Sequence, residues 1–471
     1  MKWIACALLV LSLLGALPAR SSAEGQLVML PPEDIASRFY TNPSNLFDIG
    51  DPHILPAGGK YYAFATGGTV GYNVWESSDL RTWGNKQKAL RKVEWAAGDY
   101  WAPEVYPYQD RYVMLFSVRD KETKGLRIGI AIADEPQGPY EDPLDKPLFE
   151  PGYSVIDASL FVDDGIPYLY YVRDCSDNVV GSNHESHVYG VQLSGDLLSF
   201  EGEPVELTRP DQPWELDSGG WLWNEGPVVV KHDSRYYMYY SAHYFADPNY
   251  SVGVALSDSP LGPYTKQADN PLLAPVFQND KTLVSGPGHN SFFTVGEELF
   301  TSYHSHKYPQ APSGNRQLNI DRAGFRKDGT AYINGPTLTP QLRPLKDLGL
   351  INAALSAVIS VSGGDGSLLA DGDYGIQSAA FALLPGKEGW AELTFPSPVH
   401  SDLMMIYPAF GTAGELTVLV NGEKTAVHAF EQERLPGEAL ILHFEPLDIH
   451  SLRLELSGGL GLSEVIVTAD D

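Results

Sequence analysis

Three acidic residues stand at matching places in the sequence, each at the start of an apolar run. Asp51, Asp157 and Glu225 each lead through that run and a polar turn into an aromatic run. Acidic residues are poor strand formers, so an acid at this position indicates a side chain kept for chemistry. Two carboxyl groups, one protonated and one ionised, form an acid–base pair, and a third carboxylate nearby raises the pKa of the proton donor. Cleavage of a glycosidic bond uses such a pair.

Each of these acids also has a purely structural explanation. Asp51 fits a turn ahead of Pro52, Asp157 fits a cap on strand-end amides, and Glu225 fits a solvated loop acid before Gly-Pro. Three acids in matching register favour catalysis over three separate coincidences. The remaining acids fit turns or blade edges better, for example Glu104, Asp163 and Asp164.

Five segments of the sequence share one hairpin pattern of apolar run, polar turn and aromatic run. They start at Asp51, Ala102, Asp157, Glu225 and His289. One four-stranded sheet for each repeat, arranged radially, is the architecture of a β-propeller, so five repeats predict five blades. The inner strand of each blade then lines a central channel and opens at its mouth. A β-sandwich with coincidental hairpins is the alternative, and the matched spacings disfavour it.

The repeat pattern ends near residues 335–345, and the residues after it alternate between apolar and polar like strands of a smaller domain. Asn421-Gly422 marks a tight hairpin within it. The pattern favours a jelly-roll-like β-sandwich and resembles the galactose-binding or discoidin-like modules often appended to secreted sugar enzymes. Such a domain is expected either to bind carbohydrate or only to brace the propeller. The predicted organisation is all-β: a signal peptide at 1–23, a five-bladed propeller catalytic domain at 24–345 and a β-sandwich accessory domain at 346–471.

The N-terminus reads as a Sec-type signal peptide, with Lys2, an apolar stretch over residues 3–17 and small residues at 21–23. The protein is therefore expected to be secreted. Cleavage would remove Cys6 and leave Cys175 alone, which excludes an intrachain disulfide. Cys175 is more typical of a small packing residue than of a nucleophile.

The formal net charge of -28 indicates a surface that repels nucleic acid and anionic lipid. A neutral substrate such as a sugar is compatible with this charge. No apolar run after the signal approaches the length of a membrane span. We expect no nucleic-acid or membrane partner and a monomer or weak oligomer.

Five motifs in order carry a family resemblance: "GDPHIL", "YWAPEVY", "VIDASLFVDD", "NEGPVVV" and "SGPGHNSFF". They resemble the successive blade motifs of glycoside hydrolase family 43, over about residues 46–340. The resemblance implies a five-bladed propeller that hydrolyses arabinans, xylans and related glycans with inversion. It makes Asp51 the general base that activates water, Glu225 the general acid, and Asp157 the acid that tunes and orients Glu225. Inversion predicts base and acid carboxyls roughly 6.5–9.5 Å apart, whereas about 5 Å favours retention.

The same resemblance assigns further site residues. Trp101 is placed beside the sugar, with blade packing as the alternative, and Arg316 is expected to reach the sugar hydroxyls, with Arg322 as the alternative. His289 is placed near the channel axis, where it approaches a calcium or similar ion, often through water. Any such metal is expected to be structural, and no cofactor is required for the chemistry. A lone histidine is more often a hydrogen-bonded core residue.

The substrate is expected to contain arabinose or xylose, and we favour an exo-acting α-L-arabinofuranosidase or β-xylosidase. An endo-arabinanase of the same family, a retaining fructan-active enzyme and a non-catalytic sugar-binding propeller are the alternatives. Insertions at 173–186 and 209–223 are expected to flank the channel mouth. They bring Trp214, Trp221 and Trp223, which are expected to wall off a pocket.

Overall fold

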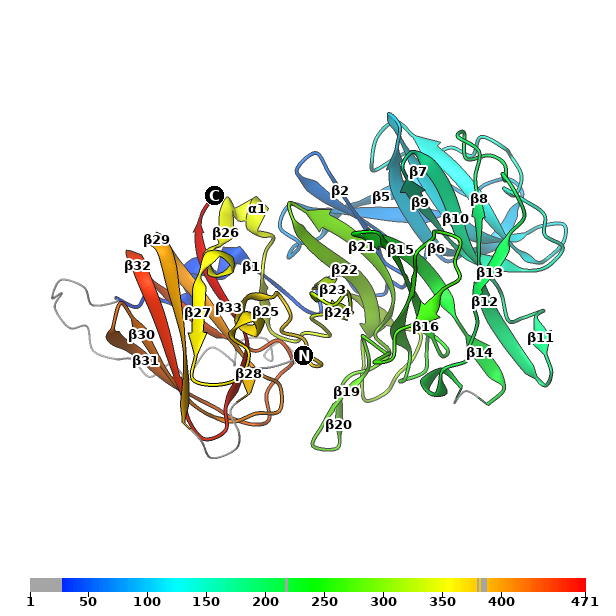
Figure 1. The fold of residues 1–471 in the computed structure, drawn as a ribbon. Helices are drawn as coiled ribbons and strands as arrows, with labels where there is room; N and C mark the ends of the chain where they lie inside the picture. The colour runs from blue at the N-terminus through cyan, green and yellow to red at the C-terminus, as the bar shows by residue number, and fades with distance from the viewer. Residues whose placement is uncertain (1–27, 217–218, 379–380, 383–387) are drawn as a thin grey trace, which may run out of the picture.

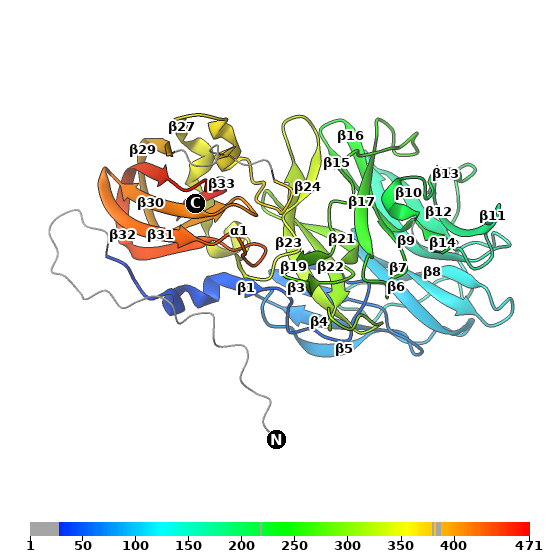
Figure 2. The same cartoon turned by 90° about the horizontal axis from the view of Figure 1, so that it is seen from below.

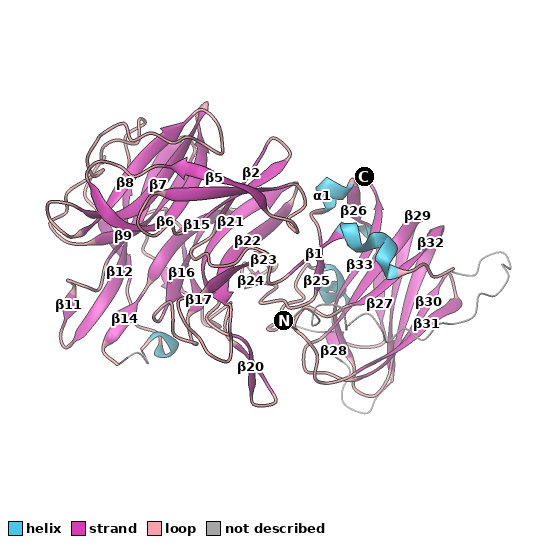
Figure 3. Cartoon of the chain, turned by 180° about the vertical axis from the view of Figure 1, so that it is seen from behind, coloured by secondary structure: helices cyan, strands magenta, loops and turns pink. Residues whose placement is uncertain are grey.

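The computed structural model describes residues 28–216, 219–378, 381–382 and 388–471. The predicted signal peptide at 1–23 lies outside these residues. Strands dominate the described chain, as Figure 3 shows, and the helices are short. Two β-rich bodies lie side by side (Figure 1): a propeller and a C-terminal domain. Among the described residues, no helix is long and apolar enough to cross a membrane.

Five sheets form the propeller, as predicted. Three blades have four antiparallel strands: β2–β5 (His53–Ala57, Lys60–Phe64, Tyr72–Ser77, Gly84–Leu90), β15–β18 (Glu225–His232, Arg235–Ala242, Ser251–Ser257, Thr265–Lys266) and β21–β24 (Gly288–Val295, Glu298–His306, Arg316–Phe325, Ala331–Ile333). The second blade has three strands: β6 (Ala96–Tyr108), β7 (Arg111–Asp120) and β8 (Leu126–Ala133). A small hairpin of β19 (Val276–Gln278) and β20 (Lys281–Val284) precedes the fifth blade.

The third blade is larger than the prediction of four strands. Its core is β9 (Val155–Asp163), β10 (Ile166–Arg173), β12 (Asn183–Gln192) and β13 (Val205–Thr208). Two short strands, β11 (Val179–Val180) and β14 (Trp221–Trp223), join β12 and come from the two insertions noted in the sequence. The aromatic second strands are buried on both faces because neighbouring blades pack against them, as in β16.

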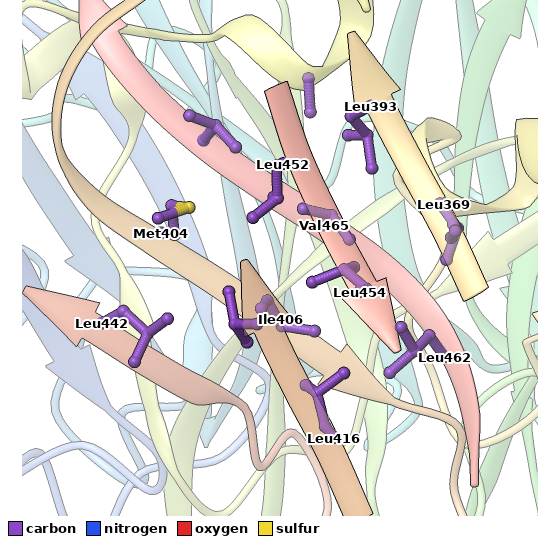
Figure 4. Close-up of a cluster of buried hydrophobic side chains, with 14 of the residues drawn as sticks. Leu369, Leu393, Met404, Ile406, Leu416, Leu442, Leu452, Leu454, Leu462 and Val465 are labelled. Atoms are coloured by element: carbon purple, nitrogen blue, oxygen red, sulfur yellow. The ribbon is translucent and has the colours of Figure 1, made fainter. Parts of the chain in front are cut away.

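The C-terminal domain is an antiparallel sheet of eight strands: β26 (Leu350–Asn352), β27 (Val358–Val361), β28 (Phe381–Ala382), β29 (Gly389–Pro408), β30 (Gly414–Val420), β31 (Glu423–Phe430), β32 (Leu440–Leu456) and β33 (Gly461–Asp470). The long strands β29 and β32 pair along most of their length through two register shifts, and this gives the domain its sandwich-like form. The predicted Asn421-Gly422 hairpin joins β30 to β31, with both residues at positive φ. Alternate apolar residues fill the core, including Leu393, Met404, Ile406 and Leu454 (Figure 4).

The N-terminal segment passes from the C-terminal domain to the propeller and contacts both (Figure 2). Met29 bridges Phe444 of β32, and η1 (Pro32–Arg38) then leads to β1 (Phe39–Thr41). Strand β1 pairs with β25 (Pro340–Leu342), which precedes the short helix α1 (Leu345–Leu348). Arg38 pairs with Asp402 of β29 at 2.6 Å. The segment before β1, which the sequence assigned to the propeller, therefore packs on the C-terminal domain.

Candidate active site

A cavity of about 480 Å³ lies where the inner strands of the five blades begin. Its lining brings together the three predicted acids and the predicted residues Trp101, Arg316 and His289, with further aromatic and polar residues. The lining residues are Asp51, Thr66, Trp101, Ile156, Asp157, Asp174, Cys175, Trp221, Trp223, Glu225, Tyr244, Phe245, His289 and Arg316. Four carboxyl groups therefore share one pocket.

Every blade breaks its first strand pair at the same place with a one-residue bulge. The residue at the bulge has a positive φ in all five blades: Asp51 (54°), Ala102 (39°), Asp157 (56°), Gly226 (57°) and His289 (51°). The register shifts at this point in the four later blades, and in the first blade the Thr66 N–H donates to Gly50 O just before it. A bulge bends the strand and redirects its side chain. The repeated bulge therefore turns these positions toward the channel axis.

A side chain from the preceding blade accepts the backbone N–H at each bulge. Four of these acceptors occupy one equivalent position, opposite the residue that precedes the bulge of their own blade. Each accepts the N–H at the bulge of the next blade: Thr66 from Ala102 (3.0 Å), Ser117 from Asp157 (2.9 Å), Ser241 from His289 (2.8 Å) and His304 from Asp51 (3.2 Å). In the third blade this place is held by Val172, which has no acceptor. The Asp157 carboxylate takes over and accepts the Gly226 N–H at 3.0 Å. Asp157 is therefore held in place from both sides.

Glu225 does not occupy the same register as Asp51 and Asp157, contrary to the sequence prediction. It pairs with Ser241 and stands one residue before the bulge, where Gly226 takes the left-handed conformation. Glycine carries no steric penalty there. The longer glutamate side chain reaches the pocket from the earlier position, and its Oε1 accepts a hydrogen bond from the Tyr250 hydroxyl at 2.8 Å.

Asp51 is surrounded by hydrogen-bond donors. Its Oδ1 pairs with the Arg316 guanidinium at 2.7 Å and lies 3.4 Å from Nδ1 of His289, and its Oδ2 accepts the Thr66 hydroxyl. A Cβ on Gly50 would lie 1.9 Å from the Arg316 guanidinium carbon, so only glycine lets that side chain through. Burial alone would raise the pKa of Asp51, but Arg316 and the histidine His289 outweigh it and hold the pKa well below its usual range.

The pKa values of Glu225 and Asp157 are shifted upward, opposite to that of Asp51. Burial, and then the nearby Asp157 carboxylate, raise the pKa of Glu225 well above its usual value. Burial also raises the pKa of Asp157, to about 6, although His289 opposes the shift. The surroundings therefore favour the protonated form of Glu225 and the ionised form of Asp51. Within one pocket these are the states that acid–base chemistry on a buried bond requires.

Aromatic side chains form much of the pocket wall. Trp101 lines the pocket and is half-buried, and the Tyr72 hydroxyl donates to its carbonyl at 2.9 Å. Trp221 and Trp223 also line it, whereas Trp214 does not and packs against Tyr240 instead. Tyr244 and Phe245 complete the wall from the fourth blade.

The structure bears on three further expectations, for Arg322, Glu104 and Cys175. Arg322, the alternative to Arg316, lies away from the pocket and pairs with Glu298 at 2.8 Å. Glu104 is neither a turn nor an edge residue: it is buried on β6, where it accepts the Tyr106 hydroxyl, and burial and Asp157 raise its pKa well above its usual value. Burial raises the pKa of Cys175 to about 12, which suits packing and not attack.

Several residues of the site were not predicted from the sequence. Asp174 and Tyr250 follow or lie outside the repeated hairpins, and no local pattern marks them. Thr66, Ser117 and Ser241 did carry a signal in the sequence, because each is the polar residue that closes the aromatic run of its hairpin at the same distance from its bulge. The equivalent positions in the other two blades hold Val172 and His304.

The side chains around His289 do not form a ligand set for a metal ion. Among the described residues, no three His, Cys, Asp or Glu side chains gather in metal-binding geometry. The acid nearest to His289, Asp51, is already paired with the positive charge of Arg316, which disfavours a cation on that carboxylate. A calcium ion near His289 stays a prediction, and the chemistry derived below does not use it.

Comparison with known proteins places this site in a family. Residues 40–331 match the family described as glycosyl hydrolases family 43, so this chain belongs to that family and is a glycosidase acting on O-glycosyl bonds. Its substrate is therefore a carbohydrate. The matched region covers the propeller and ends before the C-terminal domain.

Individual relatives share this part of the chain. The protein is 29% identical to a β-D-galactofuranosidase from Aspergillus niger, over 55% of this chain and 72% of the relative. It is 28% identical to an extracellular exo-α-(1→5)-L-arabinofuranosidase from Streptomyces chartreusis, over 58% of this chain and 84% of the relative. Among solved structures, a thermostable family-43 glycoside hydrolase is 44% identical with a TM-score of 0.62, covering 65% of this chain and 99% of that one.

Proposed function

We propose that the protein is a secreted, inverting glycoside hydrolase that releases terminal sugars from arabinose- or xylose-containing glycans. The observation that carries the proposal is the pair of opposite pKa shifts within one pocket, downward at Asp51 and upward at Glu225. A glycosidase with two catalytic carboxyl groups needs one ionised and one protonated at the same time, and inversion is proposed from the role of general base that the family resemblance gives Asp51.

In this mechanism Asp51 accepts a proton from a water molecule as that water attacks the anomeric carbon. Glu225 donates its proton to the leaving oxygen on the opposite face of the sugar, so one bond forms as the other breaks. Arg316, His289 and Thr66 orient Asp51 and keep it ionised. Asp157 orients the backbone beside Glu225 and keeps that acid protonated.

The proposal of exo action rests on the pocket wall. Trp101 and Phe245, together with Arg316, line the cavity around the acids and favour a single terminal sugar over a long chain threading through. The relatives include an exo-arabinofuranosidase and a galactofuranosidase, both named for furanose sugars, which supports a furanoside as the first substrate to test. Secretion is proposed from the N-terminal sequence and from the relative that is named as extracellular.

One set of assays tests this function. The protein is incubated with aryl α-L-arabinofuranoside, aryl β-D-xyloside, aryl β-D-galactofuranoside and linear arabinan, and the anomeric form of the first product is followed by NMR. We expect release of monosaccharide with inverted configuration from at least one aryl glycoside. Retained configuration would contradict the roles of Asp51 and Glu225, and short oligosaccharides from arabinan without monosaccharide would show endo action instead.

A further inference from the structure

The segment that leads into the fourth blade places a row of three side chains on one face. Trp221, Trp223 and Glu225 all line the pocket, while Leu222 and Asn224 between them are buried on the other side. In an extended chain every second residue points to the same face. The row therefore runs outward from the acid, with Trp223 next to Glu225 and Trp221 beyond it.

The row is held by strand β12 of the third blade. Strand β14 pairs in parallel with β12, which sets Trp221 beside His184. The two rings stack with centroids 4.0 Å apart and planes 9° apart, and Nδ1 of His184 lies 2.9 Å from Cys175 O. Further along, the Asn224 N–H donates to Ser186 O at 3.1 Å. Among the strands that the structure describes, β12 and β14 form the only parallel pair, so this segment departs locally from the antiparallel pattern of the blades.

Trp221 is unusually open for a large aromatic residue. Its side chain is 43% exposed although one ring face lies against His184. An exposed, pre-ordered indole beside a polar pocket offers a broad apolar face at little loss of side-chain freedom. Trp223, deeper in the pocket, meets the Tyr244 ring at 5.8 Å.

We propose that Trp223 and Trp221 form the binding platform for the sugar rings on the leaving side of the scissile bond. This inference rests on the proposed function, because a general acid must touch the leaving oxygen and so fixes where the leaving group lies. Successive members of the row are about 6.5–7 Å apart along the chain, which separates two stacking positions beyond Glu225. The occupant is a neutral oligosaccharide, since the pocket carries an excess of carboxyl groups that would repel a polyanion.

The test compares substrates with and without the outer sugars. For the sugar that the enzyme releases, kcat/KM is measured on the aryl glycoside and on oligosaccharides of two to five residues, with wild type, Trp221→Ala, Trp221→Tyr and Phe277→Ala. Phe277 is 63% exposed on β19, outside the pocket, and serves as the matched control. We expect Trp221→Ala to lower the ratio of oligosaccharide to aryl glycoside kcat/KM about tenfold, with a smaller loss in Trp221→Tyr and none in Phe277→Ala.

The possible outcomes separate this inference from the proposed function. If Trp221→Ala leaves the ratio at the wild-type value with an unchanged thermal midpoint, the platform is wrong although the enzyme is active. If wild type cleaves no substrate, the proposed function is wrong. In that case, calorimetric binding of a linear arabinan pentasaccharide tests the platform separately. Tenfold weaker binding by Trp221→Ala than by wild type supports the platform, and equal binding overturns it.

Discussion

The two sides of the pocket are built on the same bulge but shift the pKa values of their carboxyl groups in opposite directions. On the first-blade side, Asp51 faces Arg316, His289 and the Thr66 hydroxyl. On the fourth-blade side, Glu225 faces another carboxylate, Asp157. Both acids are 9% exposed, so burial does not distinguish them. The contrast teaches that neighbours delivered by adjacent blades, and not depth, decide which acid keeps its proton.

The largest effect is expected when either acid is made neutral and unable to exchange a proton. Glu225→Gln and Asp51→Asn keep the shape of the side chain, and each should lower kcat on an aryl glycoside about 10²–10⁴-fold. Circular dichroism and the thermal midpoint report whether the fold is intact. Near-normal turnover in either variant would remove that residue from the mechanism.

The next largest effect is expected from Asp157→Asn, which removes the negative charge that raises the pKa of Glu225. Glu225 must be protonated to act, so activity is lost as pH rises through its pKa. With that pKa lowered, the alkaline limb of the pH profile of kcat should move to lower pH by about one unit. Because the pKa of Asp157 itself is about 6, the difference from wild type should shrink below that pH. An alkaline limb that does not move would show that Asp157 does not tune the acid.

A smaller shift of the pH profile, in its acid limb and toward higher pH, is expected from Arg316→Met. Loss of the guanidinium raises the pKa of Asp51, and a base works only when ionised, so activity at low pH is lost first. The acid limb of kcat/KM should therefore move to higher pH, while Arg316→Lys, which keeps the charge, should move it less. Equal shifts in the two variants would point to lost packing over Gly50 instead of lost charge.

The smallest effect is expected at Val172, the one place in the ring of bulges without an acceptor. Val172→Thr keeps the branched shape and supplies a hydroxyl that competes with Asp157 for the Gly226 N–H. Partial release of Asp157 should lower kcat a few-fold and broaden the alkaline limb, with little change in stability. Val172→Ile serves as the control, since it adds no acceptor, and a matching loss there would assign the effect to crowding.

The sequence predicted much of this architecture because its signals are local. Five apolar-to-aromatic hairpins specify five blades, and the acid that opens a hairpin marks the channel mouth. The one-residue offset of Glu225 was missed because Gly226 and the acid before it look equivalent until the bulge is seen. The pairing of Arg316 with Asp51 joins residues 265 positions apart, and only the closure of the ring brings them together. The opposite pKa shifts follow from such contacts and have no local signature.

The N-terminal segment has a consequence for how the chain acquires its structure. Leu30 donates its N–H to His443 O, and Glu445 donates to Val28 O. These N-terminal residues therefore cannot form their hydrogen bonds until β32, which lies more than four hundred residues later in the sequence, has been synthesised. Strand β1, which follows this segment, pairs with β25, and the chain runs from β25 through α1 into the C-terminal domain. Anchoring of the N-terminal segment therefore depends on β32, and a chain truncated after residue 345 would lose the anchor of its own beginning.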